Sequence, residues 1–481
     1  MNKTGVPVSE NEYYHGCVVT VNGKDCPVHA CRVSAMSFNT VWPGHQRPLD
    51  QTESAGFVTY DCDGPVTMNV TVKTPVSDAV VRPLSRGVAV SVTEKTASFT
   101  LPGAGQYTFE VNGRHNALHI FINEPENEEE KKAGLAATYS FGPGYHEVGM
   151  MTLQSGESVY LAPDAVVSGG IFAKDAENIR VFGRGILDGA IYKRPGEEGN
   201  VPEGVFCLSG LMAFERCRNV SVEGVVLRDS PAWNVTAINC VGLHYDGLKV
   251  IGQWRYNTDG FDLCNCQNVH VNDCFLRTFD DSIVIKGLYL DERRQLEKMN
   301  NLHYLIENCV VWCDWGGALE IGAETVCDEY DDILFRNIDI IRNDNGGIRL
   351  QSGDRAHIHN IRYEDIRVEY SKYDRLHVYQ VSDDMKYEPE DKPYAEPAIT
   401  AWMYCGRWSP DNILGHVDDI HFKNVAIRTD FALPAPWLSF KGGDETHECR
   451  DVTIENVTVN GVHEVPRIVL NSFARDIRIK N

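Results

Sequence analysis

The sequence predicts an all-β protein in two parts: an N-terminal β-sandwich over residues 1–135, followed by a right-handed parallel β-helix over residues 136–481. Short runs of alternating apolar and polar residues between turn residues fill the first part, as is typical of a sandwich. From Thr138 onward an imperfect repeat replaces them, at intervals of roughly 23 to 35 residues and without helical connectors. One copy of such a repeat cannot bury its own apolar face, so the copies must stack.

The first part contains strand-like runs separated by turn residues such as Gly64-Pro65 and Asn112-Gly113. Two roles are open for this domain. It is either a cap over the open end of the β-helix, which solenoids need to cover their terminal core, or a carbohydrate-binding module. The cap is the favoured interpretation. The charged segment 123–132 that follows is interpreted as an exposed linker.

Each copy of the repeat begins with Asn, Asp or Gly and gives two short strands with a polar corner between them. Because the corners recur at one place in each copy, asparagine side chains can form a ladder from coil to coil. These features are typical of a parallel β-helix. Copies begin at Asn178, Asn219, Gly242, Asn268, Asp332, Asn360, Asp419, Asp451 and Asp476.

Composition limits the classes of function. The formal net charge of −23 disfavours a nucleic-acid partner, since phosphate binding needs clustered Lys and Arg. No run is long enough for a transmembrane helix, so no membrane partner is expected. The N-terminus has no apolar signal segment, which favours a cytoplasmic location, or a secreted one if a leader has been lost. Oligomeric state is not indicated.

The fifteen cysteines are scattered through strand-like runs, which is typical of buried thiols in a reducing compartment. Cys264-x-Cys266 and Cys309-x3-Cys313 have no second Cys/His pair at zinc-finger spacing. We therefore expect neither a metal nor a cofactor.

Three acidic residues stand out as candidate catalytic groups. Asp259 lies in the polar turn Asn257-Thr258-Asp259-Gly260, and Asp280-Asp281 directly precede an apolar strand. The spacing from Asp259 to Asp280 is about one coil of a β-helix, whose strands stack about 4.8 Å apart, so the three carboxylates should meet. Adjacent residues of a regular strand face opposite ways, so Asp280 and Asp281 must lie at a bend for both to act. Taken alone, the three acids could equally be strand-corner caps or a calcium site.

Several motifs, in order, resemble those of the pectinase-fold glycoside hydrolases, which comprise the polygalacturonases of family 28 and the dextranase and isopullulanase relatives of family 49. The resemblance covers residues 138–481, and the preceding β-domain resembles the sandwich placed before the helix in the dextranase-like group. It rests on residues 141–146, 179–189, 229–233, 257–260 and 279–286.

The resemblance implies hydrolysis with inversion, with Asp280 as general acid and with Asp259 and Asp281 holding the water. In an inverting enzyme the two carboxyl groups are expected about 6.5–9.5 Å apart. Crowding the three carboxylates should also raise the pKa of at least one of them, so that an acid stays protonated near neutral pH.

Two departures from the polygalacturonase pattern bear on the substrate. The coil that should carry a Gly-His-Gly segment has no histidine, and the Arg-Ile-Lys that grips a sugar carboxylate keeps Arg349 but has Gln351 in place of the lysine. Losing that cation removes a charge-assisted contact, which favours a neutral sugar. The residues expected to bind substrate are Asn257, Lys286, Trp315, Glu320, Arg349 and Gln351; Lys286, Glu320 and Arg349 alternate with apolar residues and should project into the cleft.

The favoured function is therefore an inverting hydrolase of an α-linked, neutral poly- or oligosaccharide. A polygalacturonase-like hydrolase of galacturonides is the alternative within this class. A non-catalytic carbohydrate-binding β-helix protein and a β-eliminating lyase are alternatives from other classes. Loops at residues 192–206, 288–301 and 371–416 should form the cleft walls, and the aromatics Trp402, Tyr404 and Trp408 of the last loop either stack on sugar rings or pack within the loop.

Overall fold

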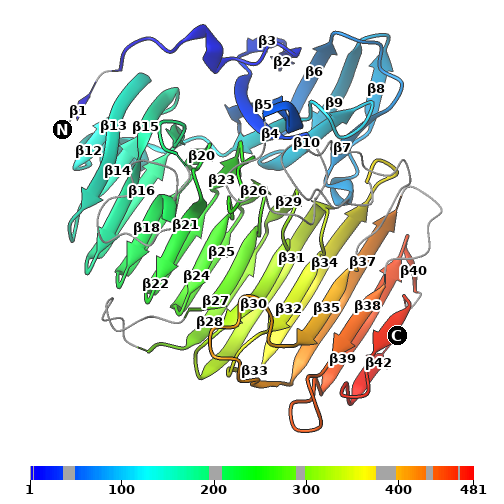
Figure 1. The fold of residues 1–481 in the computed structure, drawn as a ribbon. Helices are drawn as coiled ribbons and strands as arrows, with labels where there is room; N and C mark the ends of the chain where they lie inside the picture. The colour runs from blue at the N-terminus through cyan, green and yellow to red at the C-terminus, as the bar shows by residue number, and fades with distance from the viewer. Residues whose placement is uncertain are drawn as a thin grey trace.

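The computed structural model describes residues 2–3, 5–35, 49–193, 209–288, 298–374, 397–429, 437–463 and 466–480. Figure 1 shows a long stack of coils, running in colour from cyan to red, with a smaller β-domain in blue along one side. In the described part only one segment is α-helical, α1 (Glu128–Ala136). The predicted fold class, a β-sandwich followed by a parallel β-helix, is confirmed.

The sandwich consists of two five-stranded sheets, ordered β4-β5-β11-β10-β7 and β3-β2-β6-β9-β8, with a core of Val, Ile and Phe between them. Its elements are η1 (Glu10–Glu12), β2 (Cys17–Val21), β3 (Lys24–Cys26), β4 (His29–Ser34), η2 (Leu49–Gln51), β5 (Thr52–Asp61), β6 (Val66–Val72), β7 (Ala79–Arg82), η3 (Leu84–Arg86), β8 (Val90–Thr93), β9 (Thr96–Leu101), β10 (Gly105–Val111) and β11 (Leu118–Asn123).

The β-helix has three parallel faces, which we name the site sheet, the back sheet and the flank sheet. The site sheet contains β13 (Gly144–Leu153), β15 (Ala165–Lys174), β18 (Ser209–Glu215), β21 (Trp233–Ile238), β24 (Phe261–Cys264), β27 (Ile283–Gly287), β30 (Leu319–Thr325), β32 (Ile348–Ser352), β35 (Ile399–Met403), β38 (Leu438–Lys441) and β41 (Ile468–Leu470).

The back sheet contains β12 (Tyr139–Phe141), β14 (Ser158–Leu161), β16 (Glu177–Gly183), β19 (Arg218–Glu223), β22 (Val241–Asp246), β25 (Gln267–Asn272), β28 (Asn301–Glu307), β31 (Glu329–Asn343), β34 (Ile361–Tyr370), β37 (Ile420–Thr429), β39 (Val452–Val459) and β42 (Ile477–Lys480). The flank sheet contains β17 (Ile186–Asp188), β20 (Val226–Arg228), β23 (Lys249–Ile251), β26 (Phe275–Thr278), β29 (Val310–Cys313) and the second half of β31. Short strands β1 (Asn2–Lys3), β33 (His357–Ile358), β36 (His416–Val417) and β40 (Val462–His463) pair at the edges.

The polar residues of the repeat make the corners of the coils. Asn268 and Asp332, like most of the Asn and Asp residues that begin copies, have φ between +50° and +60°, a left-handed conformation that these two residue types tolerate best after glycine. The predicted ladder forms at the corner between the back sheet and the flank sheet. There Asn308 Nδ2 donates to Asn272 Oδ1 at 2.7 Å, and Asn337 Nδ2 donates to Asn308 Oδ1 at 2.6 Å. The ladder satisfies amide groups that would otherwise be left unpaired at each turn.

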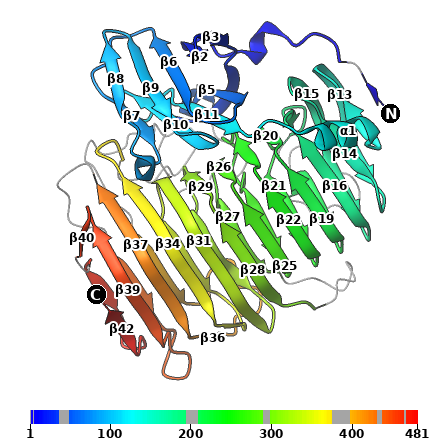
Figure 2. The same cartoon turned by 180° about the vertical axis from the view of Figure 1, so that it is seen from behind.

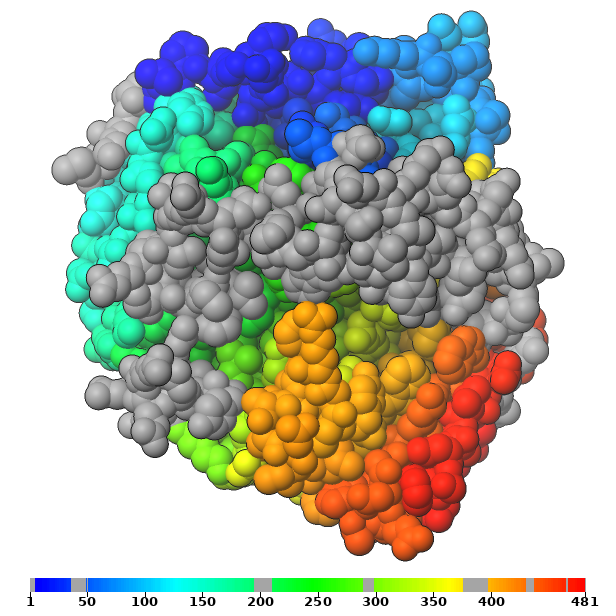
Figure 3. Space-filling model, in the orientation of Figure 1, coloured from blue at the N-terminus to red at the C-terminus, as the bar shows by residue number. Residues whose placement is uncertain are grey.

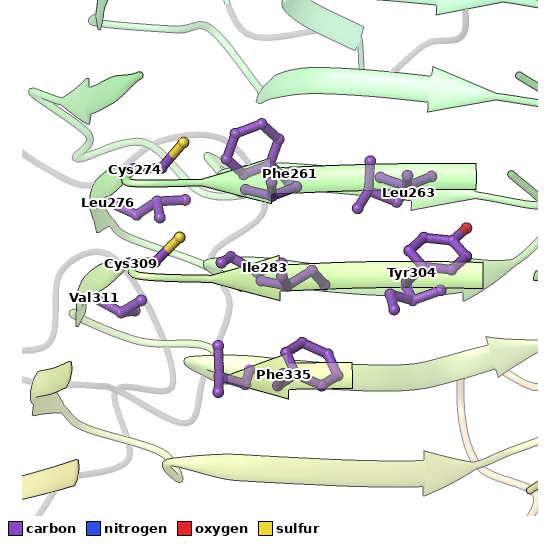
Figure 4. Packing of buried hydrophobic residues seen from close by; sticks show 14 of the residues in the cluster. Phe261, Leu263, Cys274, Leu276, Ile283, Tyr304, Cys309, Val311 and Phe335 are labelled. Atoms are coloured by element: carbon purple, nitrogen blue, oxygen red, sulfur yellow. The ribbon is translucent and has the colours of Figure 1, made fainter. Parts of the chain in front are cut away.

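Inside the coils, equivalent positions stack into columns. Figure 4 shows Phe261 over Ile283 and Cys274 over Cys309, one coil above the next. Cys274 and Cys309 belong to a set of buried free thiols, and in the described part all cysteines are free and only Cys405 is exposed. The expectation of buried thiols without disulfides therefore holds for most of the described cysteines.

The sandwich lies along the flank sheet, as the views in Figures 1 and 2 agree. Phe57 and Phe121 of the sandwich pack against Val226, Phe275 and Trp312 of successive coils. The expected cap is therefore wrong: the sandwich buries the outer apolar side chains of the flank sheet and does not cover the open end of the helix.

The charged segment 123–132, expected to be an exposed linker, is helical in its second half, because residues 128–136 form α1. Asn127 accepts hydrogen bonds from the backbone N–H groups of Glu129 and Glu130, and the Glu130 carboxylate accepts from the N–H of Asn127. This reciprocal cap, with three glutamates in the first turn, stabilises the helix at this position. None of the helices in the described ranges is long and apolar enough to cross a membrane.

Candidate active site

The three candidate acids lie together, as predicted. Asp259 is in the turn before β24, and Asp280 and Asp281 are in the turn before β27. The two strands pair in register, with Phe261 opposite Ile283, so the turns lie on adjacent coils. One carboxylate oxygen from each acid lies within 4.8 Å of the others.

Backbone hydrogen bonds fix these turns to one another. Gly260 N–H donates to the carbonyl oxygen of Asp281 at 2.8 Å, and Asp281 N–H donates to Asp280 Oδ1 at 3.1 Å. Asp280 and Asp281 lie outside the regular strand, at the bend that the sequence required for both to face the same space. The expected separation of 6.5–9.5 Å is not met by the nearest oxygens, because one coil step and one peptide bond hold the acids closer.

Burial and mutual repulsion set the charge of the acids. Asp259 is 2% exposed and Asp280 8% exposed. Burial raises the pKa of Asp259 to about 7; Lys286 opposes this rise and Asp281 adds to it. Burial, followed by the charges of Asp259 and Asp281, raises the pKa of Asp280 well above its ordinary value. Burial and the neighbouring carboxylates therefore favour the protonated form of Asp280, while Asp259 is close to its midpoint at neutral pH.

Lys286 forms ion pairs with Asp259 and Asp262. Its Nζ is 3.2 Å from Asp259 Oδ2 and 2.7 Å from Asp262 Oδ1, and it rests 4.1 Å from the ring centroid of Trp233. The side chain points out of the helical core, as its alternation predicted, but it is 5% exposed because the two carboxylates enclose it. Burial lowers the pKa of Lys286, but Asp262 and Asp259 outweigh burial and keep the ammonium charged.

Asp262 is a site residue that the sequence analysis missed. It is fully buried, and one of its oxygens, Oδ2, has no hydrogen-bond partner among the described protein groups. Burial, then Asp259, raises its pKa well above the ordinary value, although Lys286 lowers it. The available signal was its position between the core residues Phe261 and Leu263, which places it on the outer face of β24.

Glu320 and Arg349 lie on the same face, on the next two coils. In the register Val284, Glu320 and Arg349 are neighbours across β27, β30 and β32. Arg349 Nη2 is 3.4 Å from Glu320 Oε1, while Glu320 Oε2 is buried without a hydrogen-bond partner among the described groups. Burial raises the pKa of Glu320 well above its usual range, Arg349 lowers it and Asp281 raises it further. Both side chains are therefore within electrostatic reach of the acids, and Arg349 remains partly exposed.

The other expected binding residues surround this group. Trp315 stacks on Phe279, with ring centroids 5.5 Å apart and an interplanar angle of 7°, and remains partly exposed. Asn257 is partly exposed in the turn before Asp259, with φ of +58°. Gln351 is on the outer face of β32, one coil from Trp402. All six expected binding residues thus lie on the site sheet or its turns, and their contact with substrate stays a prediction.

Aromatic side chains continue beyond Gln351. Trp402 Nε1 donates to Ser439 Oγ at 2.9 Å, and Lys441 Nζ is 4.3 Å from the Trp402 ring centroid. Tyr404 and Trp408 are 43% and 46% exposed. In Figure 3 the orange segment after β35 stands out from this face, beside a hollow with green and yellow coils at its floor. Most of the three loops expected as cleft walls lies outside the described residues, namely 194–208, 289–297 and 375–396.

The acids were also a candidate calcium site. Among the described residues, Asp259, Asp280 and Asp281 form the one cluster of three groups that could ligate a metal. Calcium takes six to eight oxygen ligands, whereas the ammonium group of Lys286 already neutralises Asp259 at 3.2 Å. The arrangement therefore fits acid–base chemistry better than cation binding.

Comparison with known proteins places this geometry in context. The model of the family described as Glycosyl hydrolases family 28 matches residues 149–471. Probable exopolygalacturonase B of Aspergillus terreus is 24% identical over 211 residues, which are 40% of this chain and 45% of the relative. The chain spans less than half the length of the curated relatives it matches.

Two solved structures share the fold. Dex49A from Penicillium minioluteum superposes with a TM-score of 0.63 at 14% identity, covering 99% of this chain and 96% of Dex49A, so both domains have counterparts. A hyperthermoactive exopolygalacturonase from Thermotoga maritima superposes with a TM-score of 0.50 at 18% identity, covering 73% of this chain and 86% of that one. At these identities the likeness establishes the fold alone.

Proposed function

The chain belongs to glycosyl hydrolase family 28, and from this premise we propose that it hydrolyses an α-linked glycan with inversion, using Asp280 as general acid and Asp259 with Asp281 to activate water. One observation carries the proposal: three carboxylates meet within 4.8 Å on the outer face of the helix, where burial raises the pKa of Asp259 and of Asp280. Raised pKa values in a group of crowded carboxyls mark candidates for acid and base roles.

The reaction follows from these charges. Asp280 donates its proton to the glycosidic oxygen as the bond from that oxygen to the anomeric carbon breaks. A water held by Asp259 and Asp281 forms the new bond to that carbon and gives one proton to the carboxylate pair. Lys286 keeps Asp259 ionised enough to accept it, and the Asp281 carboxylate is held by a hydrogen bond from Gly317 N–H at 2.7 Å.

Inversion is supported by family membership and not by distance, since the nearest oxygens lie closer than the general range for inverting enzymes. Close carboxylates can still hold one water between them. Asp259 and Asp281 then accept hydrogen bonds from that water, and Asp280 is left to face the leaving group. The anomeric form of the first product decides the point.

The substrate class we favour is a neutral glycan. Both cations nearest the acids are already paired, Lys286 with two aspartates and Arg349 with Glu320, and Gln351 replaces the second cation of the carboxylate-gripping motif. A galacturonide carboxylate would have to displace Glu320 from Arg349 at 3.4 Å, at the cost of leaving a buried carboxyl without its partner.

A galacturonide is the second candidate, and one observation favours it: the curated relatives are named exopolygalacturonases. If they share a substrate with this chain, Arg349 is a cation beside the acids that such a substrate can reach, because its side chain is partly exposed.

The experiment is a panel of neutral α-glucans, fructans, polygalacturonate and galacturonide oligomers, read by reducing ends and by near-ultraviolet absorbance. We expect new reducing ends on a neutral glycan without an absorbing product. Hydrolysis of galacturonides alone selects the second candidate, an absorbing product indicates a lyase, and binding without turnover indicates a non-catalytic protein.

Asp280→Asn should lower kcat by about 10² to 10⁴ while the thermal midpoint stays close to wild type. Near-normal turnover in this variant would contradict the assignment of Asp280 as general acid.

A further inference from the structure

The β-sandwich reaches the acid-bearing turns through one buried side chain. Arg114, in the turn between β10 and β11, inserts at the corner where the flank sheet turns into the site sheet. We propose that Arg114 is a positioning residue of the active site, which holds the turn of Asp280 and Asp281 through Asp314. This inference rests on the proposed function and assigns the sandwich a part in the reaction.

Asp314 is the link between the domains. It follows β29, directly before Trp315, and it is fully buried. Arg114 Nη2 lies 3.2 Å from its Oδ1, to which Trp312 Nε1 also donates at 2.8 Å, and Arg277 Nε lies 3.4 Å from its Oδ2. A buried carboxylate with three donors from two domains has a fixed place, since moving it would leave a charge unpaired.

Arg114 spans two coils. Besides Asp314 it contacts Asp344, the equivalent residue one coil later, at 3.1 Å from Nη2 and 3.3 Å from Nη1. Burial raises the pKa of Asp344 to about 6, and Arg114 lowers it. The guanidinium therefore ties the corners of two successive coils together, with the planar, rigid fork that suits two carboxylates.

A second contact from the sandwich supports the same corner. Arg277 Nη1 lies 3.1 Å from His119 Nε2, and the guanidinium sits 4.0 Å from the Trp312 ring centroid. Burial, followed by the charge of Arg277, lowers the pKa of His119 well below its ordinary value. The neutral imidazole of His119 then accepts a hydrogen bond from Arg277. The positive charge of Arg277 therefore remains available to pair with the Asp314 carboxylate.

From Asp314 the contacts lead to both acids. Its backbone N–H donates to the carbonyl of Thr278 at 2.9 Å, and Thr278 Oγ1 donates to the carbonyl of Asp280 at 2.6 Å. Three residues beyond Asp314, Gly317 N–H donates to Asp281 Oδ1 at 2.7 Å. Asp314 thus holds the single turn that carries Asp280 and Asp281 through two sets of contacts, and a shift there moves the general acid and the water-binding carboxylate together.

The simplest alternative is that Arg114 only joins the two domains. Arg82 is the matched control, because it too is a buried arginine of the sandwich between two carboxylates, Glu110 at 3.0 Å and Glu369 of β34 at 2.5 Å. Glu369 lies on a later coil, and among the described residues neither it nor Arg82 forms a hydrogen bond or ion pair with the turns of Asp259, Asp280 and Asp281. Arg82→Met therefore removes an interdomain ion pair without removing a contact of these turns.

The test compares Arg114→Met, Arg114→Lys and Arg82→Met in the full chain. We expect Arg114→Met to lower kcat about 10- to 100-fold with KM changed less than about twofold, since a displacement near 1 Å costs up to about 10² in rate. Arg114→Lys should recover only part of the loss, because it keeps the charge but not the fork that contacts two carboxylates, and Arg82→Met should keep kcat within about twofold. Equal kcat in the two methionine variants would overturn the proposal.

Hydrogen–deuterium exchange gives a readout that needs no substrate. In Arg114→Met, amides of residues 277–287 and 312–320 should exchange faster than in Arg82→Met; equal exchange overturns the proposal as well. If the wild type hydrolyses no glycan, the proposed function fails by itself and the exchange comparison still decides whether Arg114 holds the turns. If Arg114→Met does not fold, Arg114→Lys against Arg82→Lys carries the same comparison.

Discussion

Replacing Lys286 with Met tests the electrostatics of the site most directly. The change keeps an unbranched side chain beside Trp233 and removes a positive charge 3.2 Å from Asp259. With an effective dielectric constant of about 20 that charge is worth about 5 kcal/mol, and in a water-like medium about 1.3 kcal/mol. The pKa of Asp259, about 7 in the wild type, should therefore rise by about 1 to 4 units.

The assay is the pH dependence of kcat/KM on the glycan found in the panel. Because the base must be ionised, the acid limb of the profile should move to higher pH by at least about one unit, so kcat/KM at pH 6 should fall about tenfold or more. Lys441→Met is the control, since Lys441 is on the same sheet but packs on Trp402, and its profile should keep the wild-type acid limb. A folded Lys286→Met variant with an unmoved acid limb would refute the assignment of Asp259 as base.

The same variant has a second, thermodynamic consequence. Asp259 and Asp262 already have raised pKa values in the folded state, and the loss of Lys286 raises them further. A carboxyl whose folded pKa exceeds its unfolded value of about 4 binds more protons when folded, so stability falls as pH rises through that interval. The difference in thermal midpoint between wild type and variant should therefore widen as pH rises above about 7, the pKa of Asp259 in the wild type; a constant difference would mean that the charge of Lys286 does not act on these acids.

Three further predictions concern the same turns. Gly316→Ala should lower kcat about tenfold or more, because an added Cβ would lie 2.3 Å from Asp281 N and has to push the backbone of that turn; wild-type kcat would show that the turn tolerates movement. Proton NMR of early product from the α-linked substrate should show the β-anomer first, whereas an α-anomer would indicate retention. Dialysis against EDTA should leave kcat unchanged, because Lys286 and not a metal ion neutralises Asp259; loss of activity that calcium restores would contradict this interpretation.

The features that could be predicted from the sequence are those that a short stretch determines. Asp259, Asp280 and Asp281 were found because their turns are one coil apart, and the corners at Asn268 and Asp332 because the repeat places a polar residue there. The helix α1 had a local signal too, the capping box of Asn127 and Glu130, but the run of charges around it was taken as a linker.

What could not be predicted depends on contacts between distant segments. Alternation placed Lys286 on the outer face, but nothing near it in the sequence indicates that Asp262 lies 2.7 Å from its ammonium group on the neighbouring coil. The position of the sandwich is the larger example. Arg114 and Asp314 are 200 residues apart, and neither has a neighbour pattern that distinguishes it from a surface charge.

The cysteine thiols differ in burial from one part of the molecule to another, so their reactivity can report which part has unfolded. Cys405, exposed beside Tyr404, should react with a thiol reagent in the native state, whereas Cys17 and Cys26 of the sandwich, whose pKa burial raises to about 11, should react when that domain loosens. The stacked thiols of the coils, such as Cys274, are enclosed and need the solenoid itself to come apart. Labelling kinetics read by mass spectrometry can therefore time the loss of each domain separately, without any engineered probe.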